Sequence, residues 1–395
     1  MKAQEIFEAY QEYIIPTYTK YPLIFVKGKG SYLWDIHGKK YLDFFPGWGV
    51  VSVGHCHPKV MSALREQLSK LIFVANNYYH TGQAKLAKEL NFSGFKSKLF
   101  FCNSGAEANE AAIKFSRKFG AGRYGIITFE NSFHGRTLAT LAATGQKKYQ
   151  EGFAPLPDGF CSVPFNELGA VKKAVNGNTV AIMIELVQGE GGINVANADF
   201  VMGLRKLCDE NKMLLIVDEV QTGIGRTGKM FCYQHYGIEP DIVTLAKALA
   251  GGMPMGAMMV KKEIADTLGK GTHASTFGGG PLATKAALAV LRAVHKENLI
   301  GNASRMGAYL VKKLDDLKSR HAVIKEVRGI GLMLAVELGI EGNAIVDESL
   351  KRGLLINCTH GNVLRLMPAL NVTKSQVNQA INILDKVLKE KNKDQ

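Results

Sequence analysis

Asp218 and Lys247 stand out among the ionisable residues because each follows an apolar segment. Asp218 comes directly after the strand-like run 213–217, and Lys247 lies within 244–252, Thr-Leu-Ala-Lys-Ala-Leu-Ala-Gly-Gly. Such surroundings leave little water to hold a proton on the lysine, so its amine becomes available as a nucleophile towards an aldehyde. The alternative is a lysine at the surface and an aspartate that only caps the next element.

These two residues together indicate a cofactor. An acid at the end of a buried strand is costly unless it faces a cation, and the protonated ring nitrogen of pyridoxal phosphate (PLP) is such a cation. PLP also carries the aldehyde that a lysine amine attacks. Lys247 and Asp218 are therefore the minimum pair that lets PLP act as an electron sink, and both are predicted to be catalytic.

A phosphate site is predicted at residues 103–109, Asn-Ser-Gly-Ala-Glu-Ala-Asn, which follow the strand candidate 99–102 and open an apolar-periodic helix. Ser104 and Glu107 have the spacing of a capping box, and Gly105 lets an anion approach the backbone closely. Free N–H groups at such a helix start bind phosphate. A plain capped helix is the alternative.

Apolar strands alternate with helical stretches between about residues 98 and 260. The strand candidates are 98–102, 124–129, 180–185, 214–217 and 241–244. Apolar strands without alternation are typical of parallel strands covered on both faces by helices. Because ligands in open α/β sheets collect beyond the carboxyl ends of the strands, we expect the motifs above to converge.

One glycine-rich segment is a decoy. Residues 223–228, Gly-Ile-Gly-Arg-Thr-Gly, fit a dinucleotide pattern and, with Lys229, nearly complete a P-loop. A P-loop needs Ser or Thr after the lysine, and this chain has Met230. Five residues also separate the strand from the first glycine, and no clear helix follows. These glycines are predicted to shape a turn under the cofactor ring.

The segment 218–228, Asp-Glu-Val-Gln-Thr-Gly-Ile-Gly-Arg-Thr-Gly, followed by 247–252, Lys-Ala-Leu-Ala-Gly-Gly, resembles the class III aminotransferases. Those are fold-type I PLP-dependent transferases, and the resemblance extends from about residue 22 to 370. It implies an α/β fold in which a mostly parallel large-domain sheet has helices on both faces, joined to a smaller α+β domain.

The domain boundaries follow from this resemblance and from a change of pattern near residue 281. Helices at 282–297 and 305–320 precede strands at 323–328, 332–337, 354–356 and 363–366, and a last helix covers 373–388. This order is typical of an α+β unit. We expect a large PLP-binding domain at 46–285 and a small domain formed by 1–45 and 286–395.

The resemblance implies further cofactor contacts. Ser104, Gly105 and Ala106 match the phosphate cradle of the family. Phe133 matches the aromatic residue that stacks on the pyridine ring. The remaining matches are Val220 on the opposite ring face, Gln221 at the ring hydroxyl, and Thr276, which crosses a homodimer interface to the partner subunit's cofactor phosphate. The family usually has Asn where this chain has Gly280, which puts the geometry of the 273–279 loop in doubt.

Two arginines are implied as carboxylate ligands, because guanidinium grips a carboxylate in bidentate fashion. Arg136 matches the residue that holds the substrate carboxylate distant from the reacting carbon. Arg365 matches the residue that binds the α-carboxylate, and Glu190 is its expected masking partner. Ser275 is a further expected substrate contact. Trp48 replaces a small aliphatic residue or a tyrosine of relatives, and it either narrows the donor pocket or belongs to the core.

The implied reaction is transfer of the δ-amino group of N2-acetyl-L-ornithine to 2-oxoglutarate, a step of arginine biosynthesis. Donors left open are ornithine, succinylornithine, succinyldiaminopimelate and 4-aminobutyrate. Glutamate-semialdehyde aminomutase uses similar parts without a second substrate. A basic binding protein that keeps only the fold predicts no cofactor spectrum and no loss of function on Lys247→Ala.

Bulk properties exclude several classes of protein. The net charge of +14 comes from dispersed lysine doublets rather than one stripe, so no nucleic-acid partner is expected. Six scattered cysteines without a Cys-x-x-Cys pair, no apolar leader and no long apolar run predict a cytoplasmic protein without a membrane partner. His55 and His57 form the closest histidine pair, but further ligands are lacking, so no metal is expected.

Overall fold

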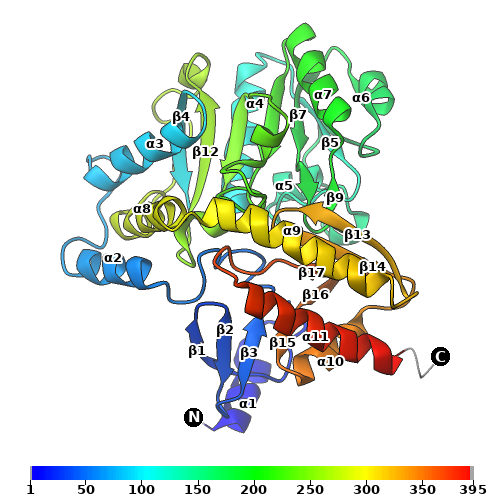
Figure 1. The fold of residues 1–395 in the computed structure, drawn as a ribbon. Helices are drawn as coiled ribbons and strands as arrows, with labels where there is room; N and C mark the ends of the chain where they lie inside the picture. The colour runs from blue at the N-terminus through cyan, green and yellow to red at the C-terminus, as the bar shows by residue number, and fades with distance from the viewer. Residues whose placement is uncertain (1, 392–395) are drawn as a thin grey trace.

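The computed structural model describes residues 2–391, in which a large sheet and two smaller sheets form separate layers (Figure 1). The large sheet has seven strands in the order β4, β12, β11, β10, β7, β5, β6. Their bounds are Ser97–Cys102, Gly256–Lys261, Ile242–Leu245, Leu214–Asp218, Thr179–Ile184, Gly125–Phe129 and Phe160–Val163. Only β12 runs antiparallel to its two neighbours, so the sheet is mostly parallel, as predicted.

The five strands predicted from the sequence are confirmed within one residue at each end. Sequence reasoning missed β6 and β12. Cys161 and Ser162 of β6 are exposed, so this edge strand lacks a continuous apolar run. The apolar β12 was missed because it follows the apolar Lys247 segment after only a few residues, so the sequence shows no clear boundary between them. Its antiparallel direction is determined by hydrogen bonds with β4 and β11.

Helices cover both faces of the large sheet, because successive residues of its central strands point to opposite sides. In β10, Ile216 belongs to the apolar cluster that contains α4 (Gly105–Phe119). The next residue, Val217, belongs to the cluster that contains α7 (Ala198–Glu210). All five residues of β10 are buried, which explains their uniformly apolar character before Asp218.

The two smaller sheets come from the ends of the chain. One contains β1 (Phe25–Lys29), β2 (Tyr32–Asp35), β3 (Lys40–Asp43) and β15 (Leu354–Leu355). The other contains β13 (Ile324–Ile330), β14 (Met333–Leu338), β17 (Val363–Leu366) and β16 (Asn357–Thr359). A two-stranded ribbon, β8 (Val187–Gln188) with β9 (Asn194–Val195), follows β7.

The pairing of β3 with β15 joins the amino-terminal segment to the carboxyl-terminal one. A small domain built from both ends of the chain requires such a contact. The domain boundaries at 45/46 and 285/286 stay a prediction. Position 285 lies inside α8 (Pro281–Lys296). Met1 and residues 392–395, which were also assigned to the small domain, lie outside the described residues.

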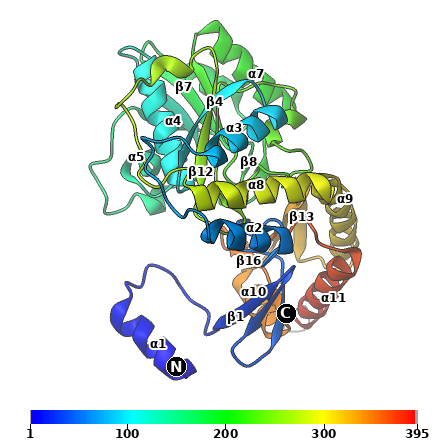
Figure 2. The same ribbon diagram turned by 90° about the vertical axis from the view of Figure 1, so that its left-hand side faces the viewer.

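The remaining helices surround these sheets. They are α1 (Ala3–Tyr13), α2 (Pro58–Leu68), α3 (Thr81–Ser93), α5 (Leu138–Ala143), α6 (Leu168–Ala174), α9 (Leu299–Lys318), α10 (Asn343–Lys351) and α11 (Lys374–Lys391). Figure 2 shows α1 standing apart from the body, and none of its residues is buried. No helix within residues 2–391 is both long and apolar enough to cross a membrane.

The predicted helices 282–297 and 373–388 are confirmed as α8 and α11, but α9 begins at Leu299 rather than at 305. Gly301 and Asn302 disfavour a helix by intrinsic propensity, which caused the error. Tertiary contacts override that preference, since the Asn302 side chain donates to the carbonyls of Leu370 and Val372.

Candidate active site

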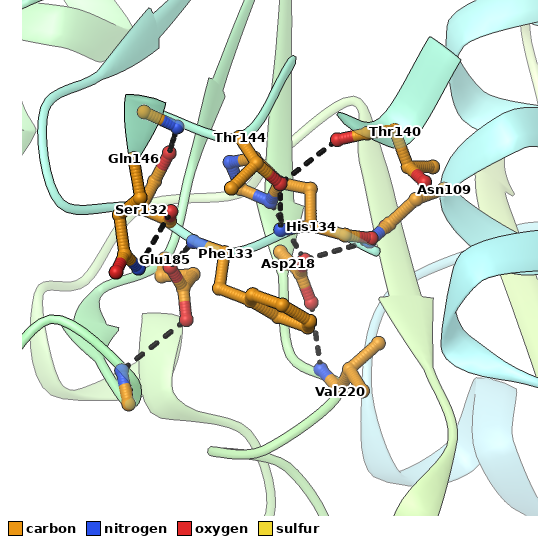
Figure 3. A network of polar contacts seen from close by, with 12 residues as sticks. Asn109, Ser132, Phe133, His134, Thr140, Thr144, Gln146, Glu185, Asp218 and Val220 are labelled. Carbon is orange, nitrogen blue, oxygen red and sulfur yellow. Dashed lines mark hydrogen bonds and ion pairs between the residues drawn. The ribbon is translucent and has the colours of Figure 1, made fainter. Parts of the chain in front are cut away.

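Asp218 lies buried at the carboxyl end of β10 and is held by three partners (Figure 3). Its Oδ2 accepts a hydrogen bond from Asn109 Nδ2 at 2.8 Å and lies 2.8 Å from His134 Nδ1. Its Oδ1 accepts a hydrogen bond from the Val220 N–H at 3.0 Å. These contacts satisfy a buried carboxylate and fix its direction, as an anion that faces a cofactor ring requires.

Sequence reasoning missed His134 and Asn109. Burial opposes a charged His134, but the hydrogen bond and charge of Asp218 outweigh it and raise the pKa of the imidazole. Asn109 lies one turn beyond Gly105 on α4, and His134 follows Phe133. Both residues lie inside motifs that were already singled out. Each is a polar residue among apolar or small neighbours, and that pattern could have marked it as a partner of Asp218.

The predicted capped helix start is confirmed at Ser104, whose Oγ accepts a hydrogen bond from the Glu107 N–H at 3.1 Å. The first N–H groups of α4, those of Gly105 and Ala106, have no intrahelical acceptor. A Cβ atom on Gly105 would lie 2.8 Å from Val220 Cγ1, so only glycine allows this close approach. The cradle therefore sits against the residue predicted to cover one ring face.

Lys247 begins the 3-10 turn Lys247–Ala250, just after β11, with φ of 41°. Burial lowers the pKa of its ammonium, while the charges of Glu190, Asp218 and Glu185 act in the opposite direction. The net lowering makes the neutral amine more accessible near neutral pH, in the direction expected from the sequence. The same interactions place Lys247 beside the carboxylates of the site.

Gln221 and Trp48 meet at the site, because Gln221 Nε2 donates to the Trp48 carbonyl at 3.3 Å. Gln221 Oε1 is buried without a hydrogen-bond partner among the described residues. A buried orphan acceptor calls for a donor, and the ring hydroxyl of PLP would supply one. Together with the cradle at Gly105 and the fixed Asp218, this orphan atom shows that the residues present fit the cofactor.

Glu185, at the end of β7, was not singled out from the sequence, although it lies within the same network. Its Oε2 accepts a hydrogen bond from the Phe133 N–H at 2.8 Å, and its Oε1 accepts one from the Gly189 N–H at 3.2 Å. Burial raises the pKa of this carboxyl group. Glu185 therefore ties the loop of Phe133 to the loop that carries Glu190.

The predicted pairing of Arg365 with Glu190 is confirmed at 2.7 Å between Nη1 and Oε1. Arg365 is 1 % exposed, and it also donates to the Gly189 carbonyl and to Asn357 Oδ1, each at 2.8 Å. Burial disfavours the charged form of Glu190, yet the adjacent guanidinium outweighs it and lowers the pKa of this carboxyl group. The Arg365 guanidinium also lies 4.8 Å from the centre of the Phe45 ring, and this ring packs against Trp48.

Arg136 differs from Arg365 in its exposure and in its lack of a carboxylate partner, although both guanidinium groups lie over an aromatic ring. Its side chain is exposed, and within residues 2–391 it makes no ion pair. Its guanidinium carbon lies 4.0 Å from the centre of the Tyr149 ring and 5.5 Å from that of Phe133. A free guanidinium beside the predicted stacking residue is available for an incoming carboxylate.

The 273–279 loop returns to the phosphate end of the site. Ser275 Oγ accepts a hydrogen bond from Asn103 Nδ2 at 3.1 Å, and Asn103 directly precedes the cap of α4. The Thr276 side chain is exposed. A reach of Thr276 into a partner subunit stays a prediction.

The glycine-rich segment 223–228 forms a turn, as expected, in which Gly225 and Gly228 have φ of 90° and 88°. Arg226 within it is buried and donates to the carbonyls of Leu332 and Pro368. These contacts tie the turn to the carboxyl-terminal segment, so it serves packing rather than dinucleotide binding.

The histidine pair near residue 56 is also engaged in protein contacts. His55 Nε2 lies 2.7 Å from Asp43 Oδ2, and His57 Nε2 lies 3.3 Å from Glu297 Oε2. Within the part of the chain that the structure describes, no group of three or more His, Cys, Asp or Glu side chains could hold a metal ion.

Comparison with known proteins agrees with this geometry. The family model described as aminotransferase class III matches residues 13–388. The chain belongs to the class III aminotransferases. It is therefore a PLP-dependent aminotransferase. The catalytic roles of Lys247 and Asp218 stay predictions.

Relatives of this aminotransferase cover nearly its full length. An acetylornithine aminotransferase of Methanocaldococcus jannaschii is 52% identical over 385 residues, which is 96% of this chain and 97% of the relative. The ornithine aminotransferase structure from Toxoplasma gondii ME49 has a TM-score of 0.96 at 32% identity, covering 100% and 97% of the two chains. The acetylornithine aminotransferase structure from Elizabethkingia anophelis has a TM-score of 0.88 at 32% identity, covering 98% and 99%.

Proposed function

We propose that this aminotransferase transfers the δ-amino group of N2-acetyl-L-ornithine to 2-oxoglutarate, giving N-acetylglutamate 5-semialdehyde and L-glutamate. The observation that carries the proposal is the pair of unlike arginines. Arg365 is closed off by Glu190, whereas Arg136 is open. The donor has one carboxylate, far from its reacting amine, and the acceptor has two. One permanently free arginine and one maskable arginine suit that alternation.

The identity of the donor is supported by the curated relatives. The archaeal relative at 52% identity is named for acetylornithine. The Toxoplasma structure is named for ornithine, and it favours unacylated ornithine as a second candidate. Trp48 bears on the choice, since its carbonyl contacts Gln221 while its indole is 48% exposed and free to pack against an acyl chain.

Bound PLP supplies an electron sink that stabilises negative charge at the donor carbon. The protein residues do the rest. The Lys247 amine would take the proton from the donor carbon and deliver it to the cofactor carbon bonded to the same nitrogen, acting first as general base and then as general acid. Asp218, held by Asn109 and His134, keeps the ring nitrogen protonated. Glu190 masks Arg365 while the ω-amine is bound and releases it for 2-oxoglutarate.

The assembly and location are also proposed. A homodimer would bring Thr276 of one subunit to the phosphate cradle of the other, and the exposure of Thr276 leaves it available for such a contact. The six cysteines are all free thiols, which supports a reducing, cytoplasmic location. Sedimentation velocity with and without PLP tests the dimer, and a monomeric holoenzyme would contradict it.

Steady-state kcat/KM for a panel of ω-amines, with 2-oxoglutarate as acceptor, tests the reaction. We expect N-acetylornithine to give the highest value, above ornithine, N-succinylornithine and 4-aminobutyrate. A higher value for ornithine would favour the second candidate. Multiple turnover without any added oxo acid would instead indicate an aminomutase.

A further inference from the structure

Tyr149 lies beside Arg136, but neither the sequence motifs nor the proposed roles include it. Its ring centre is 4.0 Å from the Arg136 guanidinium carbon, which is within cation–π distance. The same ring meets Phe133 edge-on, with centres 5.8 Å apart and planes at 87°. Tyr149 thus contacts both Phe133, the predicted ring-stacking residue, and Arg136, which has no ion-pair partner among the described residues.

The turn that carries Tyr149 is held by side-chain hydrogen bonds from the residues that precede and follow it. Gln146 precedes the turn Lys147–Tyr149 and donates to the carbonyls of Asn131 and Ser132 at 3.2 Å each. Gln150 follows it and donates to the carbonyls of Leu141 and Thr144 at 3.1 and 3.0 Å. Figure 3 shows Gln146, Ser132 and Thr144 in the network that also holds Asp218. The ring is therefore presented by a fixed backbone rather than by a loose loop.

Arg136 has no comparable support of its own. Its side chain is exposed, and a long side chain in water samples many rotamers. A guanidinium that must find its carboxylate from many rotamers binds more weakly than one already held in place. An aromatic face restrains a guanidinium without consuming its N–H donors, which stay free for a carboxylate.

We propose that Tyr149 is a specificity-determining positioning residue, which holds the Arg136 guanidinium ready for the carboxylate of the amino donor. The proposal rests on the role assigned to Arg136 in the proposed function. Lys148 also approaches the ring, with its Nζ 4.9 Å from the centre, but its exposed ammonium is farther away than the guanidinium.

Two matched donors isolate this effect. N-acetylputrescine has the same acetamide and the same reacting amine as N-acetylornithine but lacks the carboxylate. The ratio of kcat/KM for the two donors therefore measures what the carboxylate contributes. Loss of the aromatic face in Tyr149→Leu should lower this ratio about fivefold, through KM of N-acetylornithine rather than through kcat. Tyr149→Phe keeps the ring and should restore the ratio.

A double-mutant cycle with Arg136→Ala decides whether Tyr149 acts through Arg136. Arg136→Ala should lower the ratio further than Tyr149→Leu does, and adding Tyr149→Leu to it should change nothing more. A further fall in the double variant would mean that Tyr149 contacts the donor directly and would overturn the proposal. An equal loss for both donors in Tyr149→Leu would also overturn it, because that is the result of a purely structural role.

Failure of the proposed function has a different outcome. If Arg136→Ala leaves the ratio unchanged, the carboxylate role of Arg136 is wrong and the role of Tyr149 falls with it. If N-acetylornithine is not the donor, ornithine and putrescine form the equivalent pair and give the same test. Tyr124→Leu, at an exposed tyrosine before β5, controls for the loss of a tyrosine as such.

Discussion

The candidate site is built in opposite ways around Asp218, here named the floor, and around Arg136, here named the mouth. At the floor, Asp218 is buried and bound by Asn109, His134 and a backbone N–H. At the mouth, Arg136 is exposed and makes no ion pair within the described chain. The chemistry at the floor is the same whatever the substrate, so it can be fixed in advance. The mouth must accept a donor and then a differently shaped acceptor, so its groups are left available.

Arg365 stands between these extremes. It is as buried as the floor residues, but it has one partner that can leave, Glu190. A buried arginine that loses its carboxylate is costly unless another anion replaces it. Under the proposed function, a carboxylate of 2-oxoglutarate would replace the Glu190 side chain as the partner of Arg365.

The largest effect is expected at the floor, for Lys247→Ala. Loss of the amine that is proposed to bind the aldehyde and to move the proton should lower kcat more than about 10⁴-fold. Single-turnover kinetics with N-acetylornithine would measure it, and borohydride reduction should label wild-type residue 247. Lys206→Ala, an exposed lysine on α7, is the matched control. Substantial turnover by Lys247→Ala would break the assignment of the floor.

Asp218→Asn should come next, with kcat lower by about 10²–10⁴-fold, because an amide cannot stabilise a protonated ring nitrogen. Asn109→Ala removes one of the hydrogen bonds to Asp218 while keeping the carboxylate, and a loss of about tenfold is expected. The order of the two losses, measured as kcat for the half-reaction, is the critical result. Equal losses would show that the carboxylate acts only as a packing group.

Glu190→Gln tests the switch between floor and mouth. The amide keeps the size of the side chain but removes the charge that masks Arg365, so α-amines such as glutamate should gain relative to ω-amines by on the order of tenfold. Stopped-flow rates of the two half-reactions would measure the shift. Glu210→Gln removes an exposed carboxylate from an ion pair with Lys206 on α7 and is the control. A parallel fall of both rates would mean that Glu190 does not act as a mask.

The smallest effect concerns the pH dependence of stability. Burial raises the pKa of Glu219 to about 7, above its ordinary value of 4.5. A carboxyl group with a raised folded-state pKa binds more protons in the folded protein, so its contribution is complete below pH 4.5 and is lost as pH rises through 7. Wild type should therefore lose about 1–3 kcal/mol relative to Glu219→Gln between pH 4.5 and 8.

Urea unfolding of both proteins at pH 5 and pH 8 would measure this difference. Glu219 accepts hydrogen bonds from the Tyr233 N–H and the Thr222 hydroxyl, and the amide oxygen of glutamine can keep one of them. A difference between wild type and variant that does not depend on pH would show that Glu219 keeps its charge throughout.

The sequence predicted the floor better than the mouth for a physical reason. Asp218, Lys247 and the cap at Ser104 follow apolar strands, so local pattern alone located them near one edge of the sheet. The pairing of Arg365 with Glu190 was found through the family resemblance. Tyr149 and Glu185 were missed because their roles depend on neighbours far from them in sequence or on loop geometry, which no periodicity records. The early start of α9 was missed because distant carbonyls, not propensity, stabilise its first turn.

The parallel pairing of β3 with β15 affects the order in which the sheets can form during translation. Leu42 of β3 is paired with Leu354 of β15, so 312 further residues must be synthesised after Leu42 before this pair can form. At about 5–20 residues per second, that wait lasts roughly 15–60 s. During this time the large sheet can assemble, while the edge of β3 that later pairs with β15 has no strand partner.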